Sequence, residues 1–573
     1  MGVVIPPSMK YKTIDVQEYV KIWRSSVESL EALTRFWGDW ARRLVWRTPW
    51  RDVFDGRRWF PGGELNASVN VLDRHRGTYV WDKVGLIFET EEGNVRAYTY
   101  SQLHALVEAV AAKFRALGLG IGDYAVIYAP PLPETLASAW ALARIGATFE
   151  WVFTGWGRWF LAMRLRALRP KLVVTADAFP RRGKPIRVKD NVDAALKSSG
   201  LEAKVVVVPR MGVDISTGPN DIYLADIPDS GERGPAYVES SYPLFALPAT
   251  EAEGSEGTVL HETGGYLTQT YATTIWMGLR PRDTYFCTVL PGWITGITYV
   301  LFGPFMVGST VVVYEGGPDY PSWDRWWEIV EKRAVTVFLT TVGALRLLSK
   351  FSSVERYNLD TLRLVLTTAE PMEEEVWWWA YRSITGRAAV YDYDPKGGGG
   401  RIPVIHYYIT REVGTFFAGN LPNFAFAPIK PGTSGLPFPG FALDSIGPDG
   451  TSVRNSAGRL VLRMPWPAMP LESHRWRSGL FYLGDYGIID SQMYVRVVGR
   501  DDGVLKVNGY RISPGDIKKA LAEAGVEAEV KARFDPQKFQ VPLVRTRAPP
   551  EEVIRTVRTL VGPIAEPEVE QLY

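Results

Sequence analysis

The fold is decided by residues 99–153, which read TYSQLHALVEAVAAKFRALGLGIGDYAVIYAPPLPETLASAWALARIGATFEWVF. The first part, up to Gly118, has the apolar spacing of an amphipathic helix, and a glycine favours termination there. An apolar run at Tyr124–Tyr128, a second helical stretch up to Gly146 and another apolar run at 148–153 follow. Strands and helices thus alternate with short connections, which predicts βαβ units around a buried parallel sheet.

The same alternation continues downstream, with a second block from residue 284 to about residue 366. From about Val453 the sequence becomes β-rich, and after Arg500 it has the pattern of a compact unit with a hairpin, two helices and two strands. The predicted fold class is α/β. We expect a large N-terminal domain of stacked α/β layers with parallel sheets (1–500) and a small α+β C-terminal domain after a hinge (501–573).

The composition excludes several classes of protein. With 65 basic and 63 acidic side chains among 573 residues, the formal charge of +2 gives no reason to expect a nucleic-acid partner. Cys287 is the one cysteine, which excludes a disulfide framework and a cysteine-based zinc cluster. Asn and Gln are scarce, which is compatible with a thermophilic source. We expect a soluble, cytoplasmic protein of more than one domain.

Three segments allow more than one interpretation. Residues 284–314 carry no charge, but glycines and prolines interrupt them, so we expect a buried strand–turn–helix–strand passage and no membrane span. The first hundred residues are rich in Trp and Arg, which is typical of packing against a larger body, although an interface with a partner subunit stays open. Residues 391–401 have the composition of a mobile surface loop.

No single motif identifies a reaction. The sequence contains neither HExxH nor GxSxG, and its five histidines are scattered. Taken in order, however, a set of motifs resembles the acetyl-CoA synthetase branch of the adenylate-forming enzymes over almost the whole chain. These motifs are WFPGGELNASVNVLDRH (59–75), HETGGYL (261–267), PGWITGITYVLFGPF (291–305), AEP (369–371), TREVG (410–414), FYLGDYG (481–487) and GRDDGVLKVNGYRIS (499–513).

The resemblance implies a two-step reaction. ATP and a carboxylate give an acyl-adenylate and pyrophosphate, and the small domain then rotates so that the thiol of CoA can attack. The implied ligands are a small carboxylate, AMP or ATP, CoA and Mg²⁺, with no tightly bound prosthetic group. A partner subunit or a homo-oligomer stays open.

The resemblance also implies roles for individual residues. Asp485 matches the aspartate that accepts hydrogen bonds from the ribose hydroxyls, and Glu412 matches a glutamate that helps to hold Mg²⁺. Each has a structural alternative, such as capping a turn or bracing the domain junction. The other matches are Arg500 at the ribose and hinge, Glu370 and Pro371 beside adenine, Arg511 in the closed active site, Asp502 at the hinge, Gly509 beside the path of CoA, and Arg182 and Lys184 in a loop that contacts the CoA nucleotide.

The sequence departs from the family at the phosphate loop. The family reads YTSGSTGKPKG, whereas this chain reads PATEAEGSEGT (248–258). Triphosphate binding needs hydrogen-bond donors and positive charge, and one carboxylate about 4 Å from a phosphate charge costs on the order of 4 kcal/mol at an effective dielectric of 20. We expect conventional ATP binding to fail unless the glutamates point to solvent or metal ions bridge them. The degenerate loop comprises Glu251, Glu253, Gly254, Ser255 and Glu256.

Two further departures concern catalysis and substrate. The family's C-terminal lysine, which serves adenylation, has no counterpart, because no lysine follows Lys538 in the sequence. Ile409 stands where the family has the tryptophan that closes the acetate pocket, so we expect any bound acyl group to be larger than acetate.

Three readings follow. The first is a protein that keeps part of an AMP or acyl-adenylate pocket and a CoA pocket but is impaired in adenylation, as a pseudoenzyme, regulatory subunit or half-reaction enzyme. The second is an active AMP-forming acyl-CoA ligase for a short carboxylate larger than acetate. The third is a structural protein that reuses the scaffold. The departures disfavour the second reading, and the matched nucleotide residues disfavour the third.

Overall fold

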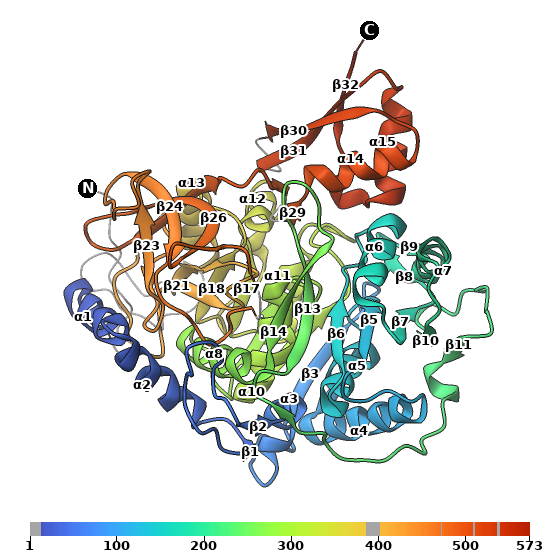
Figure 1. Ribbon diagram of the computed structural model, residues 1–573, viewed down its shortest axis with the longest axis horizontal. Coiled ribbons are helices and arrows are strands. Elements are labelled where there is room, and N and C mark those ends of the chain that lie inside the picture. Colours follow the sequence, from blue (N-terminus) through green and yellow to red (C-terminus); the bar gives the residue numbers. More distant parts are fainter. Residues whose placement is uncertain (1–12, 386–401, 471–472, 508–509, 536–538, 573) are drawn as a thin grey trace.

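The computed structural model describes residues 13–385, 402–470, 473–507, 510–535 and 539–572. Two seven-stranded sheets, both largely parallel, form the centre of the molecule (Figure 1). The first has the strand order β11 (Asp221–Tyr223), β10 (Lys204–Val208), β7 (Leu172–Ala176), β5 (Tyr124–Tyr128), β6 (Thr148–Trp151), β13 (Pro243–Ala249) and β14 (Gly257–Glu262). The second has the order β19 (Val404–His406), β18 (Leu364–Thr368), β17 (Val337–Thr341), β15 (Thr284–Cys287), β16 (Thr310–Tyr314), β3 (Val84–Glu89) and β4 (Val95–Thr99).

The two helices that the sequence predicts, up to Gly118 and up to Gly146, are present. Helix α4 (Tyr100–Ala116) begins at a capping box made by Thr99 and Gln102, and Gly118 follows it at a φ of 84°. The other helices of the two layers are α3 (Ala67–Val71), α5 (Pro133–Ile145), α6 (Arg158–Leu168), α7 (Val188–Ser199), α8 (Thr263–Trp276), α11 (Arg325–Lys332), α12 (Val342–Phe351) and α13 (Glu374–Trp379). The predicted α/β fold with stacked layers is confirmed.

The uncharged segment 284–314 is part of the core. After β15 the chain forms a short helical turn α9 (Ile294–Gly296), a wider helical turn (Ile297–Phe302) and helix α10 (Gly303–Val307), and it returns through β16. This is the strand–turn–helix–strand passage that the sequence predicts. In the described part of the chain, no helix is long and apolar enough to cross a membrane.

The Trp-rich N-terminal segment packs against helix α8 and against residues 437–441. Helices α1 (Val16–Val27) and α2 (Leu30–Ala41) run along the edge of the molecule in Figure 1. Trp37 is fully buried, and its ring centroid lies 5.8 Å from that of Trp276 on α8. The packing interpretation therefore holds for this tryptophan. The loop predicted at 391–401 lies outside the described residues.

The later part of the chain is rich in strands. It contains a small sheet of β20 (Tyr408–Ile409), β21 (Phe416–Gly419) and β22 (Leu436–Pro437), and a five-stranded sheet of β23 (Leu443–Ile446), β24 (Ala457–Leu462), β25 (Trp476–Arg477), β26 (Leu480–Ile489) and β27 (Val495–Arg500). Strands β1 (Trp46–Thr48), β2 (Glu64–Leu65) and β12 (Val238–Glu239) form a third small sheet, and β8 (Phe179–Arg181) pairs with β9 (Lys184–Ile186).

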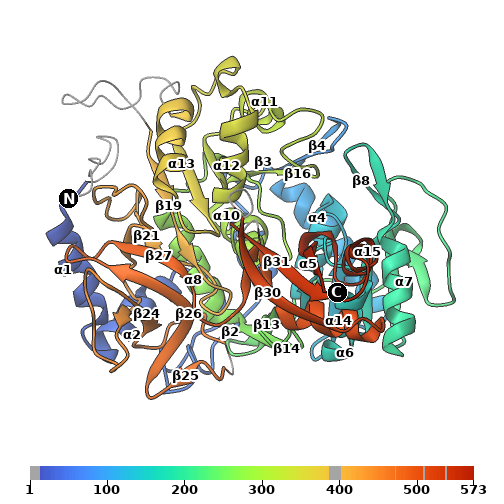
Figure 2. The ribbon, with the colours of Figure 1, turned by 90° about the horizontal axis from the view of Figure 1, so that it is seen from above.

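After β27 the chain forms a sheet of its own. This sheet contains β28 (Leu505–Val507), β29 (Tyr510–Ile512), β30 (Ala528–Asp535), β31 (Phe539–Thr546) and β32 (Glu568–Gln571), with helices α14 (Pro514–Glu523) and α15 (Pro550–Leu560) beside it. We call residues 501–572 the small domain. It lies over the junction of the two large sheets, and α15 contacts α6 (Figure 2). The boundary at residue 500 itself stays a prediction.

Candidate active site

A cavity of about 890 Å³ lies between the large sheets and the small domain. Its walls come from the segments that follow strands β6, β15 and β18, where Phe153, Val289 and Ala369 lie. Ligands of α/β proteins bind at the carboxyl ends of parallel strands, and this cavity lies at such ends of both sheets. The small domain closes it with residues from the β28–β29 hairpin and from the segment around Ile564.

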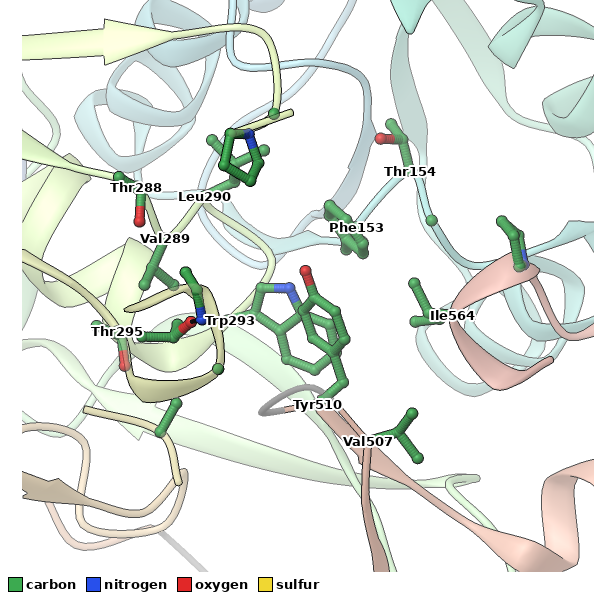
Figure 3. Close-up of a pocket in the computed structure, with 18 of the residues that line it drawn as sticks. Phe153, Thr154, Thr288, Val289, Leu290, Trp293, Thr295, Val507, Tyr510 and Ile564 are labelled. Carbon is green, nitrogen blue, oxygen red and sulfur yellow. Dashed lines mark hydrogen bonds between the residues drawn. The ribbon is translucent and has the colours of Figure 1, made fainter. Parts of the chain in front are cut away.

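Three aromatic rings form one wall of the cavity. Tyr510 comes from the small domain, and its ring centroid lies 4.8 Å from that of Trp293 and 5.7 Å from that of Phe153. Figure 3 shows the Tyr510 and Trp293 rings beside each other, with Phe153 facing them. Because two of these rings belong to the large domain, a rotation of the small domain would open this wall.

Asp485, the residue expected to bind ribose, is buried on β26. The Tyr408 hydroxyl donates to its Oδ2 at 2.7 Å, while its Oδ1 lies 3.6 Å from Arg500 Nη1 and 3.9 Å from Lys506 Nζ. Burial acts to raise the pKa of Asp485, but Lys506 and Arg500 lower it below its usual value. Among the described residues, neither Asp485 Oδ1 nor Arg500 Nη1 has a hydrogen-bond partner. The two atoms face each other as an ion pair at 3.6 Å, and each still has an unused hydrogen bond for a polar ligand.

Glu370, the residue expected beside adenine, also has a buried side-chain oxygen without a hydrogen-bond partner in the described part of the chain. The Arg346 guanidinium donates to its Oε2 at 2.8 Å, and its buried Oε1 has no hydrogen-bond partner in the described part of the chain. Burial raises the pKa of this carboxyl. Ala369, which lines the cavity, has a φ of 83°, a left-handed conformation that favours glycine. Pro371 follows Glu370 directly after β18.

Glu412 is a buried carboxylate between two arginines. Its Oε1 lies 3.4 Å from Arg511 Nη1 and 3.9 Å from Arg475 Nε. Burial acts to raise its pKa, but the two guanidinium groups lower it far below the usual range. Among the described residues no group of three or more His, Cys, Asp or Glu side chains could hold a metal ion, and the expected Mg²⁺ role of Glu412 stays a prediction. Glu412 acts in this structure as an ion-pair partner.

Asp502, the residue expected at the hinge, accepts hydrogen bonds from two arginines. Arg500 Nε donates to its Oδ1 at 2.7 Å, and Arg475 Nη2 donates to its Oδ2 at 3.2 Å. Arg475 also donates to Glu251 Oε1 at 3.0 Å, so one buried guanidinium joins the hinge to the loop 250–257. The sequence interpretation did not include Arg475.

Two of the three acidic side chains of the loop 250–257 form ion pairs with basic residues. Glu251 pairs with Arg475, and Glu256 pairs with Lys519 on α14, while Glu253 is exposed to solvent. The sequence suggested two ways to accommodate the glutamates, solvent exposure or metal bridges. The structure uses exposure for Glu253 and protein cations for the other two.

The backbone of this loop is bound to the small domain. The Ser255 amide donates to Asp516 Oδ1 at 2.9 Å, and the Gly515 amide donates to the carbonyl oxygen of Ala252 at 2.8 Å. A Cβ atom at position 515 would lie 2.1 Å from the Glu253 carbonyl oxygen, so this approach requires glycine. We call this set of contacts the loop clasp.

The loop is also fixed from the large domain. The buried Arg164 guanidinium donates to the carbonyl oxygens of Ser255, Glu256 and Gly257 at 2.9 to 3.1 Å. A second cavity of about 370 Å³ lies beside the loop, and its walls include four glutamates against Arg475 and His474. These glutamates are Glu251, Glu253, Glu256 and Glu412, with Gly254 between them. The loop thus presents carboxylates to this second cavity.

Some of the residues expected to contact the acyl group and CoA line the main cavity. Ile409 and Arg182 line it, and Arg182 Nε donates to Asp319 at 2.7 Å. Lys184 is exposed and is not among the described lining residues, and Gly509 lies outside the described part of the chain. Sequence reasoning missed Arg558, which lines the same end of the cavity and pairs with Glu566.

A family model described as "AMP-binding enzyme" matches residues 72–240 and 254–470. The chain belongs to this family. A second model, "Acetyl-coenzyme A synthetase N-terminus", matches residues 19–71. Substrates of AMP-binding enzymes of this kind are a carboxylate, ATP and CoA. The match to the first model leaves out residues 241–253, the stretch that contains Glu251 and Glu253.

Curated relatives cover nearly the whole chain. An acetyl-coenzyme A synthetase of Pyrobaculum aerophilum is 35% identical, over 97% of this chain and 87% of its own. An acetyl-coenzyme A synthetase of Deinococcus radiodurans is 36% identical, over 93% of this chain and 84% of its own. A 3-hydroxypropionyl-coenzyme A synthetase of Metallosphaera sedula is 33% identical, over 94% of this chain and 86% of its own.

Proposed function

We propose that this chain transfers an acyl group from an acyl-adenylate to CoA, and that it forms the adenylate from ATP poorly. The observation that carries this proposal is the state of the loop 250–257. Its glutamates and its backbone are engaged by Arg475, Arg164 and the small domain. A triphosphate would have to displace these contacts and lie beside carboxylates.

The part of the site that would hold AMP is built differently. It leaves buried polar atoms without partners in the described residues, namely Asp485 Oδ1, Glu370 Oε1 and Arg500 Nη1. Buried polar groups are normally hydrogen-bonded, so these three atoms favour a polar ligand. Their residues lie just behind the cavity wall, because Asp485 Oδ1 is 3.9 Å from the lining residue Lys506 and Glu370 follows the lining residue Ala369. A nucleoside monophosphate supplies hydroxyls and ring nitrogens for them without a triphosphate.

The acyl end of the cavity supports a substrate larger than acetate. Ile409, Val289 and Leu290 give it an apolar wall, and the main cavity has a volume of about 890 Å³. The hydroxyls of Thr288 and Thr295 also line it. We propose short carboxylates longer than acetate, including hydroxylated ones, and the name of the Metallosphaera relative agrees with the second class.

The relatives' names favour an alternative, an active acyl-CoA ligase that uses ATP. Carboxylate-dependent exchange between ATP and labelled pyrophosphate separates the two proposals when it is run across short and hydroxylated acids with Mg²⁺. Exchange near background in folded protein supports the impaired-adenylation proposal. Exchange at a rate that matches overall thioester formation would replace it with the ligase proposal. If the protein were only structural, the third reading, it would bind neither AMP nor CoA.

A further inference from the structure

Lys506 lies at the polar end of the main cavity, and no motif assigned it a role. It is buried on β28 and pairs directly with Arg511 of β29 in the antiparallel register. Residues that are opposite each other in such a pair project from the same face of the hairpin. Two cations therefore face the same cavity from neighbouring strands, an arrangement that destabilises the hairpin unless anions compensate it.

The protein supplies only partial compensation. Arg511 lies 3.4 Å from Glu412, but Lys506 Nζ lies 3.9 Å from Asp485 Oδ1, longer than a charge-assisted hydrogen bond. Arg411 adds a third cationic side chain to the same lining. Burial first, and then the neighbouring Arg511, lower the pKa of Arg411 to about 9, while Glu412 acts to raise it.

The carboxylates that line the cavity do not neutralise these cations. They are each paired with an arginine of their own: Glu315 with Arg210, Asp319 with Arg182, and Glu566 with Arg558. At the polar end, Glu412 offsets Arg511 and Asp485 offsets Lys506, while Arg411 has no ion pair among the described residues. This end of the cavity thus keeps one positive charge, which favours an anion.

We propose that Lys506 binds the phosphate group of the adenylate, opposite Arg511 and next to the ribose-binding carboxylate Asp485. This assignment rests on the proposed function and names a residue for it. During transfer, the CoA sulfur bonds to the acyl carbon, and the bond from that carbon to the phosphate oxygen breaks. AMP leaves with the electron pair, and the thiol proton passes to water. The phosphate gains one negative charge in this step, so a fixed cation stabilises the transition state more than the bound adenylate.

The test compares AMP with adenosine as probes, by calorimetry, on the full chain and on Lys506→Met. A lost charge-assisted hydrogen bond weakens AMP binding about tenfold to a hundredfold and leaves adenosine binding within about twofold. Lys506→Arg keeps the charge and should keep most of the AMP affinity, and it provides a folded variant if Lys506→Met is unstable. Lys518→Met changes an exposed lysine of α14 and is the matched control.

The outcomes separate the two proposals. Equal losses for AMP and adenosine in Lys506→Met would overturn the phosphate assignment, because Lys506 would then act on Asp485 and the ribose. Unchanged binding of both probes would overturn it as well, with the proposed function intact. A wild-type chain that binds neither AMP nor adenosine would overturn the proposed function itself, and the role of Lys506 with it.

Discussion

Replacing Glu251 by glutamine should open the loop 250–257 to ATP. Glu251 Oε1 accepts from the buried Arg475 at 3.0 Å, so this carboxylate occupies a donor that could bind a phosphate oxygen. The variant removes a negative charge from the second cavity and leaves this donor with a neutral, weaker acceptor that a phosphate oxygen can replace. Arg475 keeps Asp502 and Glu412 as partners, so the large domain should stay folded.

The magnitude follows from the charge that is removed. At about 4 Å and an effective dielectric of 20, a carboxylate and a phosphate charge repel by on the order of 4 kcal/mol. The Glu251 side chain is 28% exposed, so solvent screens part of this repulsion. We expect a gain of about 1.5 to 3 kcal/mol, which corresponds to roughly tenfold to a hundredfold tighter ATP binding.

The assay is the dissociation constant of ATP beside that of AMP, measured by tryptophan fluorescence or calorimetry. The matched control is Glu253→Gln, which neutralises an exposed glutamate of the same loop and should change ATP affinity less than threefold. An ATP affinity that Glu251→Gln leaves unchanged, or an equal change for AMP, would refute the reasoning that this carboxylate excludes the triphosphate.

Three further predictions concern pH, strain and substrate size. Burial raises the pKa of Asp516 to about 6 from 3.8, so the folded state binds the proton more tightly than the unfolded state. The free energy of unfolding is therefore highest at low pH and falls as the pH rises from about 4 to 6. Asp516→Asn keeps an acceptor for the Ser255 amide and should raise the free energy of unfolding at pH 7 by up to about 3 kcal/mol. Urea titrations should show a flatter dependence of this free energy on pH, and an unchanged pH profile would contradict the prediction. Ala369→Gly relieves a residue at a φ of 83° and should raise the free energy of unfolding by about 0.5 to 1 kcal/mol, whereas a loss of stability would show that the alanine is not strained. Ile409→Trp should reduce thioester formation from a supplied four-carbon acyl-adenylate at least tenfold relative to the acetyl compound, and equal effects on both would place Ile409 away from the acyl group.

The regular elements were predictable because their signals are local. Strand β5 has the bounds Tyr124–Tyr128 that the sequence predicts, since its short apolar run after Gly122 defines it without tertiary information. The uncharged segment 284–314 was also predictable, because its glycines and prolines exclude a long continuous helix.

The partners of the acidic loop could not be predicted. Glu256 and Lys519 are 263 positions apart, and Ser255 and Asp516 are 261 apart. No periodicity connects residues at such separations, so the loop clasp follows only from the docking of the small domain. The sequence suggested that the glutamates point to solvent or bind metal, and it gave no sign that Arg475 would engage Glu251.

Lys506 and Arg558 were missed for different reasons. Lys506 is part of a hairpin pattern that predicts its pairing with Arg511, but its burial depends on contact with the large domain. Arg558 lies on an amphipathic helix whose exposed and cavity-facing positions have the same polar character. Motif matches identified Asp485, Glu370 and Glu412, and the structure adds the unpartnered atoms that such matches cannot predict.

The most direct test of the central claim is the rate of acyl-CoA formation by one preparation along two routes. The first route supplies a synthetic acyl-adenylate and CoA, and the second supplies ATP, Mg²⁺, the matching carboxylate and CoA. We predict that the first route is at least a hundredfold faster, because it does not use the loop 250–257. Equal rates on the two routes would contradict the claim that this loop has lost triphosphate binding.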